Sequence, residues 1–86
     1  MEKIDLLGNL NGKKVLIYLL NHPELNFIFK ISKGLGLEHA NISNTLRLLK
    51  SINLIDSKAE GRIKIIKLTE KGKNIAINLK KIDELL

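Results

Sequence analysis

Apolar residues recur at three- and four-residue intervals in three stretches of the first 52 residues. This spacing is typical of amphipathic helices and predicts helices over residues 12–21, 27–35 and about 39–52. The residues expected to face inward are mainly aliphatic: Val15, Leu16, Leu19, Leu20, Ile28, Ile31, Leu35, Ile42, Leu46 and Leu49, with Thr45 and Ile52 beside the last stripe. Ahead of these helices, the pattern fits either a short helix or an extended arm that carries Ile4, Leu6, Leu7 and Leu10.

Cap and turn residues mark the ends of these helices. Asn11 is a good N-cap for the first helix, and Pro23 ends it because proline disfavours helical geometry in the residue before it. Gly34 is a local weakness of the second helix, costing about 1 kcal/mol relative to alanine. Gly36 supplies the turn that follows, and Asn53 is expected to end the third helix in the left-handed conformation.

The periodicity changes after residue 53. Two runs rich in β-branched residues surround a polar, glycine-containing tip, so residues 54–68 are predicted to form a β-hairpin. The alternation slips at Ile65 and Ile66, which indicates either a bulge or a strand covered on both faces. Thr69 is a credible N-cap for a last helix that runs from about residue 70 to near the C-terminus. The apolar stripe of that helix comprises Ile75, Leu79, Ile82 and Leu86, with Ile77 and Leu85 off it.

Composition narrows the class of protein. The chain of 86 residues suffices for one domain, and no repeat or Pro/Ser-rich linker marks a boundary within it. The core is expected to be aliphatic, since Tyr18, Phe27 and Phe29 are the only aromatic residues. The absence of cysteine excludes disulfides and cysteine-based zinc sites. No apolar run reaches the ~20 residues of a membrane span and no signal-peptide pattern is present, so a cytoplasmic location is expected.

The charge is positive and unevenly distributed. The formal net charge is +6, and residues 57–72 hold five basic side chains against two acidic ones, which is half of the excess. A basic surface attracts polyanions, of which duplex DNA is the commonest in the cytosol. The alternative interpretation is that modest basicity only favours solubility.

Two motifs, at the right separation, resemble a known family. Residues 31–55 read ISKGLGLEHANISNTLRLLKSINLI and are similar to the helix-turn-helix core of bacterial and archaeal winged-helix regulators, in particular the MarR-like and small archaeal winged-helix families. Ser32 matches the small residue of the first helix, and Gly36 matches the glycine of the turn. Residues 68–72, LTEKG, resemble the Leu-Thr-x-x-Gly segment that follows the wing. The apolar residues that lock the helix pair also match: Ile31, Leu35, Leu37 and Ile42.

The resemblance covers roughly residues 12–80 and implies an α+β, mainly α, winged helix-turn-helix fold. It implies a single domain over residues 1–86, with the helix-turn-helix at 31–52 and a two- to three-stranded β-wing at 54–68. A C-terminal helix at 70–86, a candidate for dimerisation, would follow the three-helix core and the wing. The implied function is that of a sequence-specific transcriptional regulator that binds double-stranded DNA, without catalysis, cofactor or metal.

The resemblance also implies where DNA would be contacted. The third helix would enter the major groove with its polar outer face, and the hairpin would lie along the backbone or minor groove. Asparagine pairs with adenine and arginine with guanine, so Asn41, Asn44 and Arg47 are the expected base readers. The remaining expected contacts are His39, Ser43 and Lys50 on the helix and Lys58, Arg62 and Lys64 on the wing.

Three residues depart from the family pattern. Leu48 points away from the predicted apolar stripe, at a position where the family usually carries a polar side chain. Glu38 suits a helix N-terminus but would repel phosphate, and Glu60 weakens the idea that the wing tip itself enters a groove.

Families of this type usually dimerise through their terminal helices, so a homodimer is expected. Its predicted interface is the apolar stripe of the last helix, which comprises Ile75, Leu79, Ile82 and Leu86. The alternative is that this stripe only closes the core. The chain is too short for the long helices that enclose an effector pocket in the MarR pattern, so a ligand sensor is not expected.

No catalytic or metal-binding pattern is present. His22 and His39 lie far apart, and neither has an obvious carboxylate at ligand spacing. Two other functions remain open: an architectural DNA-binding protein without sequence preference, and a winged-helix module that binds protein. Steep salt dependence would distinguish DNA binding from protein binding, because DNA-bound counterions are released.

Overall fold

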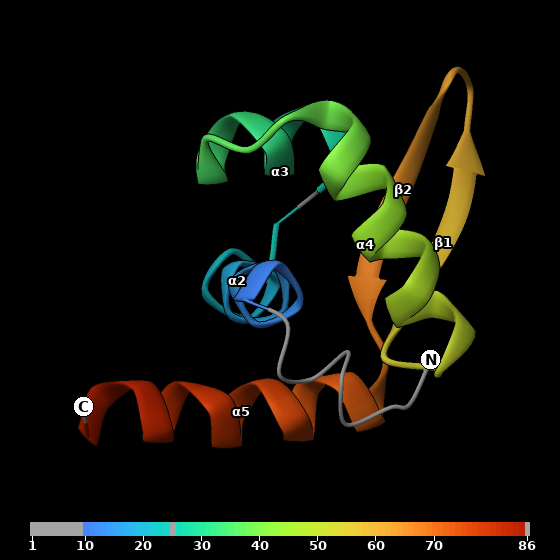
Figure 1. The fold of residues 1–86 in the computed structure, drawn as a ribbon. Coiled ribbons are helices and arrows are strands. Elements are labelled where there is room, and N and C mark those ends of the chain that lie inside the picture. The colour runs from blue at the N-terminus through green and yellow to red at the C-terminus, as the bar shows by residue number, and fades with distance from the viewer. Residues whose placement is uncertain (1–9, 25, 86) are drawn as a thin grey trace.

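The structure is a computed structural model that describes residues 10–24 and 26–85. These residues form four helices and one hairpin (Figure 1): α2 (Leu10–Asn21), α3 (Ile28–Leu35), α4 (His39–Ser51), β1 (Ile55–Glu60), β2 (Ile63–Leu68) and α5 (Glu70–Leu85). The possible N-terminal arm with Ile4, Leu6 and Leu7 lies outside the described residues, as do Leu86 and the side chain of Leu10.

The predicted elements are confirmed, with small shifts at their ends. Helix α2 begins at Leu10, so Asn11 lies inside the helix and not at its cap as predicted. The adjoining Gly12 is buried, and tertiary packing of this turn overrides the low helix propensity of asparagine and glycine. Phe27 is extended (φ −146°, ψ 166°) and precedes α3, which starts one residue later than predicted.

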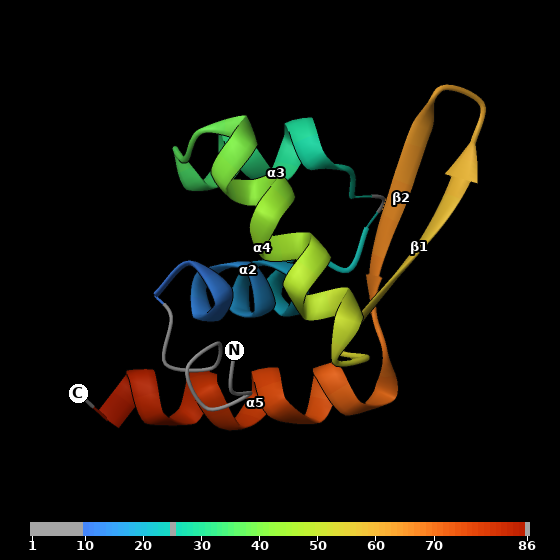
Figure 2. The same cartoon turned by 45° about the vertical axis from the view of Figure 1, so that its right-hand side comes forward.

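Helices α2, α3 and α4 form the three-helix core. Helix α5 runs alongside α2, and the hairpin rises beside α4 (Figures 1 and 2). Buried aliphatic side chains from all six elements meet between them: Val15, Leu16, Leu19, Ile31, Ile42, Leu46, Leu49, Leu54, Ile55, Ile66 and Ala76. Leu48, which departs from the family pattern, is half-buried and packs against this cluster. No helix within residues 10–24 and 26–85 has the length and apolar character to cross a bilayer.

The turn predicted at Gly36 and the left-handed conformation predicted at Asn53 are both present, one before α4 and one after it. Gly36 (φ 67°) ends α3, and Asn53 (φ 63°) follows α4. Ser32 closes the turn between α3 and α4, since its hydroxyl donates to the carbonyl oxygen of Leu37 at 2.5 Å. The backbone N–H of Leu37 donates in return to the carbonyl of Ser32 at 3.1 Å. These bonds fix the angle at which α4 leaves α3.

The hairpin pairs without a bulge, from Ile55 opposite Leu68 to Glu60 opposite Ile63. Ile65 and Ile66 point to opposite faces and are both buried, so the strand is covered on both faces where the alternation slips. Among the described residues the sheet has two strands, which is within the predicted two to three. Beside β2, the N–H of Ile66 also donates to the carbonyl of Asn26 at 2.8 Å.

The segment predicted to follow the wing anchors α5. The hydroxyl of Thr69 accepts a bond from the N–H of Gly72 at 3.0 Å, which confirms the N-cap, and donates to the carbonyl of Asn53 at 2.5 Å. The N–H of Thr69 donates to the carbonyl of Leu54 at 3.1 Å. Gly72 is buried so closely against Leu54 that a Cβ on it would overlap that backbone carbonyl. Glycine is therefore required at this contact.

The buried side of α5 includes part of the predicted stripe and two small residues that were not predicted. Its buried residues are Gly72 and Ala76, and Ile75 and Leu79 are partly buried beside them. Ile82 is 52% exposed. The prediction weighted large apolar residues, whereas the closest approach of α5 to the core uses its smallest ones.

Gly34, predicted to be a weakness of α3, makes room for Tyr18. A Cβ at Gly34 would lie 2.6–2.9 Å from atoms of the Tyr18 ring. That ring stacks on His22 with centroids 4.2 Å apart. Gly34 therefore lowers the helix propensity of α3 but allows α3 to pack closely on α2.

We expect Gly72→Ala to lower the free energy of unfolding by about 3 kcal/mol, because the new methyl overlaps backbone that has nowhere to move. Gly34→Ala is the matched control. It meets only the outer end of the Tyr18 side chain, which can shift more easily than backbone, so we expect a change within about 1 kcal/mol. Urea denaturation followed by circular dichroism measures both. Equal losses in the two variants would contradict the role given to the Leu54 carbonyl.

Candidate nucleic-acid interface

The outer face of α4 is accessible along its length. Asn41, Asn44 and Arg47 follow one another at intervals of three residues, so they form one ridge on the helix. All three side chains are exposed. His39 and Lys50, at the two ends of the same face, are also exposed, whereas Ser43 is half-buried. The residues predicted to read DNA are therefore free of the core.

Two hydrogen bonds orient this face. The guanidinium of Arg47 donates to the amide oxygen of Asn44 at 3.2 Å. The ammonium of Lys50 donates to the hydroxyl of Ser57 on β1 at 2.7 Å, which ties the last turn of α4 to the wing. Both bonds are exposed, so each contributes little stability. Their effect is to hold two cations in place without neutralising their charge.

The hairpin register separates the predicted wing residues. Lys64 pairs with Ala59 and shares a face with Ile66 and Ser57, which is the face turned toward α4. Lys58 pairs with Ile65 on the opposite face. The structure therefore brings Lys64 together with α4 but does not bring Lys58 there.

The opposite face of the hairpin is mixed in charge. The shallow hollow beside Lys58 is lined by Asp56 and Glu60 as well as by Lys67. Glu60, one of the three residues that depart from the family pattern, thus lies away from α4. Lys67 is on this face too, since it pairs with Asp56.

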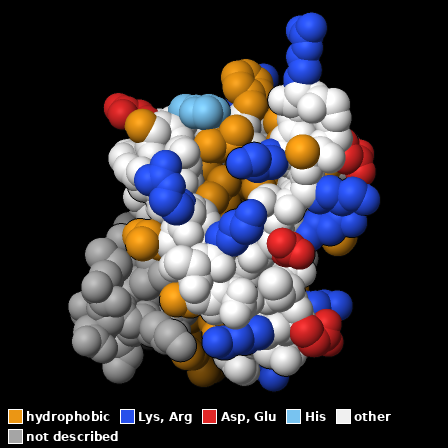
Figure 3. Space-filling view, turned by 90° about the vertical axis from the view of Figure 1, so that its right-hand side faces the viewer, with side chains coloured by type: hydrophobic (Ala, Val, Ile, Leu, Met, Phe, Trp, Pro, Cys, Tyr) orange, Lys and Arg blue, Asp and Glu red, His pale blue; other side chains and the backbone are white. Residues whose placement is uncertain are grey.

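A groove of about 530 Å³ separates α4 from the hairpin and the start of α3. Its cationic side chains are Arg47 and Lys50 from α4 and Arg62 and Lys64 from the wing, and none of the described residues that line it is acidic. Figure 3 shows apolar side chains gathered between lysine and arginine side chains on this side of the molecule. The other residues of the lining are Phe27, Ile28, Phe29, Ser43, Leu46, Ile55, Ser57, Ile63 and Ile66.

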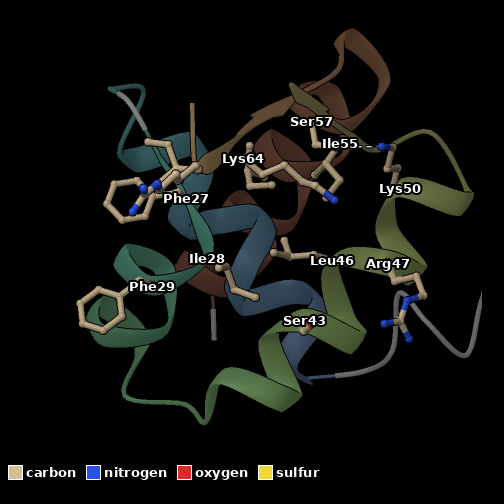
Figure 4. A pocket seen from close by; sticks show the side chains of 13 residues that line it. Phe27, Ile28, Phe29, Ser43, Leu46, Arg47, Lys50, Ile55, Ser57 and Lys64 are labelled. Atoms are coloured by element: carbon tan, nitrogen blue, oxygen red, sulfur yellow. Dashed lines mark hydrogen bonds between the residues drawn. The ribbon is translucent and has the colours of Figure 1, made fainter. Parts of the chain in front are cut away.

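None of the seven apolar residues of the groove was among the residues predicted to be functional. Phe27 and Phe29 flank the first residue of α3, and Ile63 begins β2. Phe29 is 63% exposed and Ile63 is 39% exposed. Figure 4 shows Phe27 and Phe29 across the groove from Arg47 and Lys50. One signal was available in the sequence, since both phenylalanines of the chain lie within three residues.

Glu38 and His39 lie where α4 begins. Glu38 is the N-cap residue, and its side chain makes no capping hydrogen bond. Its backbone carbonyl accepts the N–H of Ile42 at 3.1 Å. The carboxylate is exposed near the positive end of the helix dipole, where it is favourable for α4.

His22 has a carboxylate neighbour that the spacing did not predict. Its Nδ1 lies 3.4 Å from Oε1 of Glu24, and the ammonium of Lys30 lies 3.6 Å from the same oxygen. A hydrogen bond to its own backbone N–H lowers the pKa of Glu24, and the nearby Lys30 and His22 lower it further. No group of three possible metal ligands occurs within residues 10–24 and 26–85.

Neither a protein-family model nor the sequence of a curated protein matches the chain. Solved structures do. The protein AF1382 from Archaeoglobus fulgidus superposes with a TM-score of 0.85 at 25% identity, over 98% of this chain and 96% of that one. ZitR from Lactococcus lactis superposes with a TM-score of 0.80 at 23% identity, over 88% of this chain and 53% of ZitR, and supports the fold alone.

MepR, a transcription regulator of the Staphylococcus aureus multidrug efflux pump MepA, superposes with a TM-score of 0.82 at 29% identity. The match covers 90% of this chain and 59% of MepR, so the chain spans little more than half of that regulator. A MepR variant bound to an oligodeoxyribonucleotide matches equally well, with a TM-score of 0.82. The winged-helix fold predicted from the sequence is thus confirmed, and MepR among the structural neighbours is a transcription regulator.

Proposed function

We propose that the chain is a sequence-specific transcriptional regulator that binds double-stranded DNA. One observation carries the proposal: the polar ridge of α4 is exposed and stands beside a groove with four cations and no acidic residue among its described lining. The structural neighbours support it at a coarser level, since MepR is a transcription regulator and one of its variants has been solved with an oligodeoxyribonucleotide.

In this proposal α4 enters the major groove, whose base edges carry a distinct pattern of donors and acceptors for each base pair. Asn41 and Asn44 are suited to adenine, and Arg47 is suited to the paired acceptors of guanine. The hydrogen bond from Arg47 to the Asn44 oxygen leaves the asparagine amide donors and the other guanidinium donors available to bases.

The remaining cations hold α4 in position on the DNA. Lys50 projects from the last turn of α4, and Arg62 and Lys64 project from the wing, so all three suit phosphates on the wing side of the helix. His39 and Ser43 are assigned lesser contacts at the start of α4. Lys58 is left out, because it faces away from α4 beside Asp56 and Glu60. The role is one of binding without catalysis, as for the regulators among the neighbours.

We further propose a homodimer joined through α5. Ile75 and Leu79, two of the predicted interface residues, pack against the chain's own core and are only partly available. Ile82 and Leu85 are 52% and 86% exposed on the last turns of the helix. Apolar residues exposed in this way suit a self-complementary contact, which would present two copies of α4 to a palindromic site.

Arg47→Ala is expected to weaken binding to a selected duplex by about 1–3 kcal/mol and to relax the preference at one base pair. Binding-site selection from a random duplex pool, followed by fluorescence anisotropy, measures both effects. Lys81→Ala, an exposed cation of α5, is the control. If Arg47→Ala changed neither the affinity nor the base-pair preference, the proposed role of this face of α4 in reading DNA would be contradicted.

Lys64→Ala and Lys58→Ala test which face of the wing contacts DNA. Both changes remove one exposed lysine from the same hairpin, and the two lysines lie on opposite faces. Lys64→Ala is expected to weaken binding to all duplexes alike and to reduce the slope of log affinity against log salt by about 1, since one phosphate contact is lost. Lys58→Ala should leave the slope nearly unchanged. The reverse pattern would place the other face of the wing against DNA.

Ile82→Glu tests the dimer. A carboxylate buried in an apolar interface is costly, so the dimer dissociation constant is expected to rise by roughly tenfold or more. Lys81→Glu, at an exposed neighbouring position, is the matched control and should have a smaller effect. Sedimentation equilibrium measures the constants. A monomeric wild-type protein, or a dimer insensitive to Ile82→Glu, would contradict this interface.

A further inference from the structure

The side of the groove opposite Arg47 is aromatic, and duplex binding does not explain why. The chain has only two phenylalanines, and both line this groove. Phe29 is 63% exposed, which is unusual for a large apolar side chain beside a surface of lysines and arginines. The bases of a duplex are stacked inside it, so a duplex offers phosphates, sugars and base edges but no free base face to cover a phenyl ring.

The two sides of the groove match the two parts of a nucleotide. Figure 4 shows Phe27 and Phe29 on the side of α3, with Arg47 and Lys50 on the side of α4 and Lys64 between them. Unpaired bases stack on aromatic side chains, and the phosphates that link them are attracted to cations a short distance away. The described lining contains no acidic residue that would repel those phosphates.

We propose that this groove binds single-stranded nucleic acid, with a base stacked on Phe29 and the phosphates along Arg47, Lys50 and Lys64. Its volume of about 530 Å³ is in the range of sites for drug-sized ligands, so an unstacked base with its sugar fits. Phe27 and the apolar floor, which includes Leu46 and Ile66, surround the base.

This activity goes beyond the proposed recognition of duplex DNA and uses part of the same surface. Arg47, Lys50 and Lys64 contribute to both activities, so single strand and duplex compete for the protein. Phe29 serves only the single strand. The two activities therefore respond differently to substitution: Phe29 variants alter single-strand binding alone, whereas Arg47→Ala weakens both.

The test measures the affinity of the full chain for fluorescent ten-nucleotide strands at fixed salt. The strands are oligo(dT), oligo(rU) and a backbone of abasic sites that keeps the phosphates without the bases. Phe29→Leu removes the aromatic face and keeps an apolar side chain, whereas Phe29→Tyr keeps the face. Because the residue is exposed, neither change should disturb folding, which thermal denaturation checks.

We expect the wild-type protein to bind oligo(dT) or oligo(rU) more tightly than the abasic strand. The comparison of the first two strands tells whether DNA or RNA is the better ligand. Phe29→Leu should weaken binding to the better of these two strands by about fivefold or more, because the stacking of one base is lost. Phe29→Tyr should retain the wild-type affinity. The affinity for duplex DNA should be the same in both variants as in the wild-type protein. In Phe29→Trp, the strand should quench tryptophan fluorescence.

Equal affinity for the abasic strand and for oligo(dT) and oligo(rU), or equal affinity of Phe29→Leu and wild type, would overturn the proposal. Binding of an alternating Glu-Leu peptide with no binding of either base-bearing strand would also overturn it, in favour of an acidic protein segment as the occupant. Loss of duplex binding alone would refute the regulator function and leave this inference standing.

Discussion

The position of the wing depends on one junction, where the end of α4, the base of the hairpin and the start of α5 meet. Thr69 bonds to Asn53 through its hydroxyl and to Leu54 through its N–H, and it also caps α5 through Gly72. Gly72 lets α5 lie directly on the Leu54 carbonyl. Since Leu54 precedes β1 and Thr69 follows β2, both strands leave from a fixed base, and the direction of the hairpin relative to α4 is set there.

A fixed base also sets which side chains of the wing meet α4. Side chains alternate along a strand, so a slip of one residue would turn each of them to the other face. The observed register directs Lys64 and Ile66 toward α4, and directs Lys58 away from it with Asp56 on the same face. The pairing register therefore adds Lys64 to the cations of the groove and directs Lys58 away from it.

These relations explain what could be predicted from the sequence. The helices, the left-handed Asn53 and the Thr69 cap depend on near neighbours in the chain, so local patterns were sufficient to predict them. The buried side of α5 was predicted in part, since Ile75 and Leu79 of the predicted stripe do pack against the core. Gly72 and Ala76 were missed, because small residues carry little hydrophobic signal although they allow the closest packing. The aromatic side of the groove was missed, because Phe29 approaches the wing only through the tertiary fold.

The hydrogen bonds at the groove explain how its charge is kept available. Arg47 is held by the uncharged amide of Asn44, and Lys50 by the uncharged hydroxyl of Ser57. Carboxylate partners would position the same side chains but would cancel the field that attracts phosphate. Elsewhere the chain does use a carboxylate, since Glu24 lies between His22 and Lys30, on a site away from the groove. The cations beside α4 are thus positioned without being neutralised, which suits a polyanionic ligand and accounts for a surface that single and double strands would share.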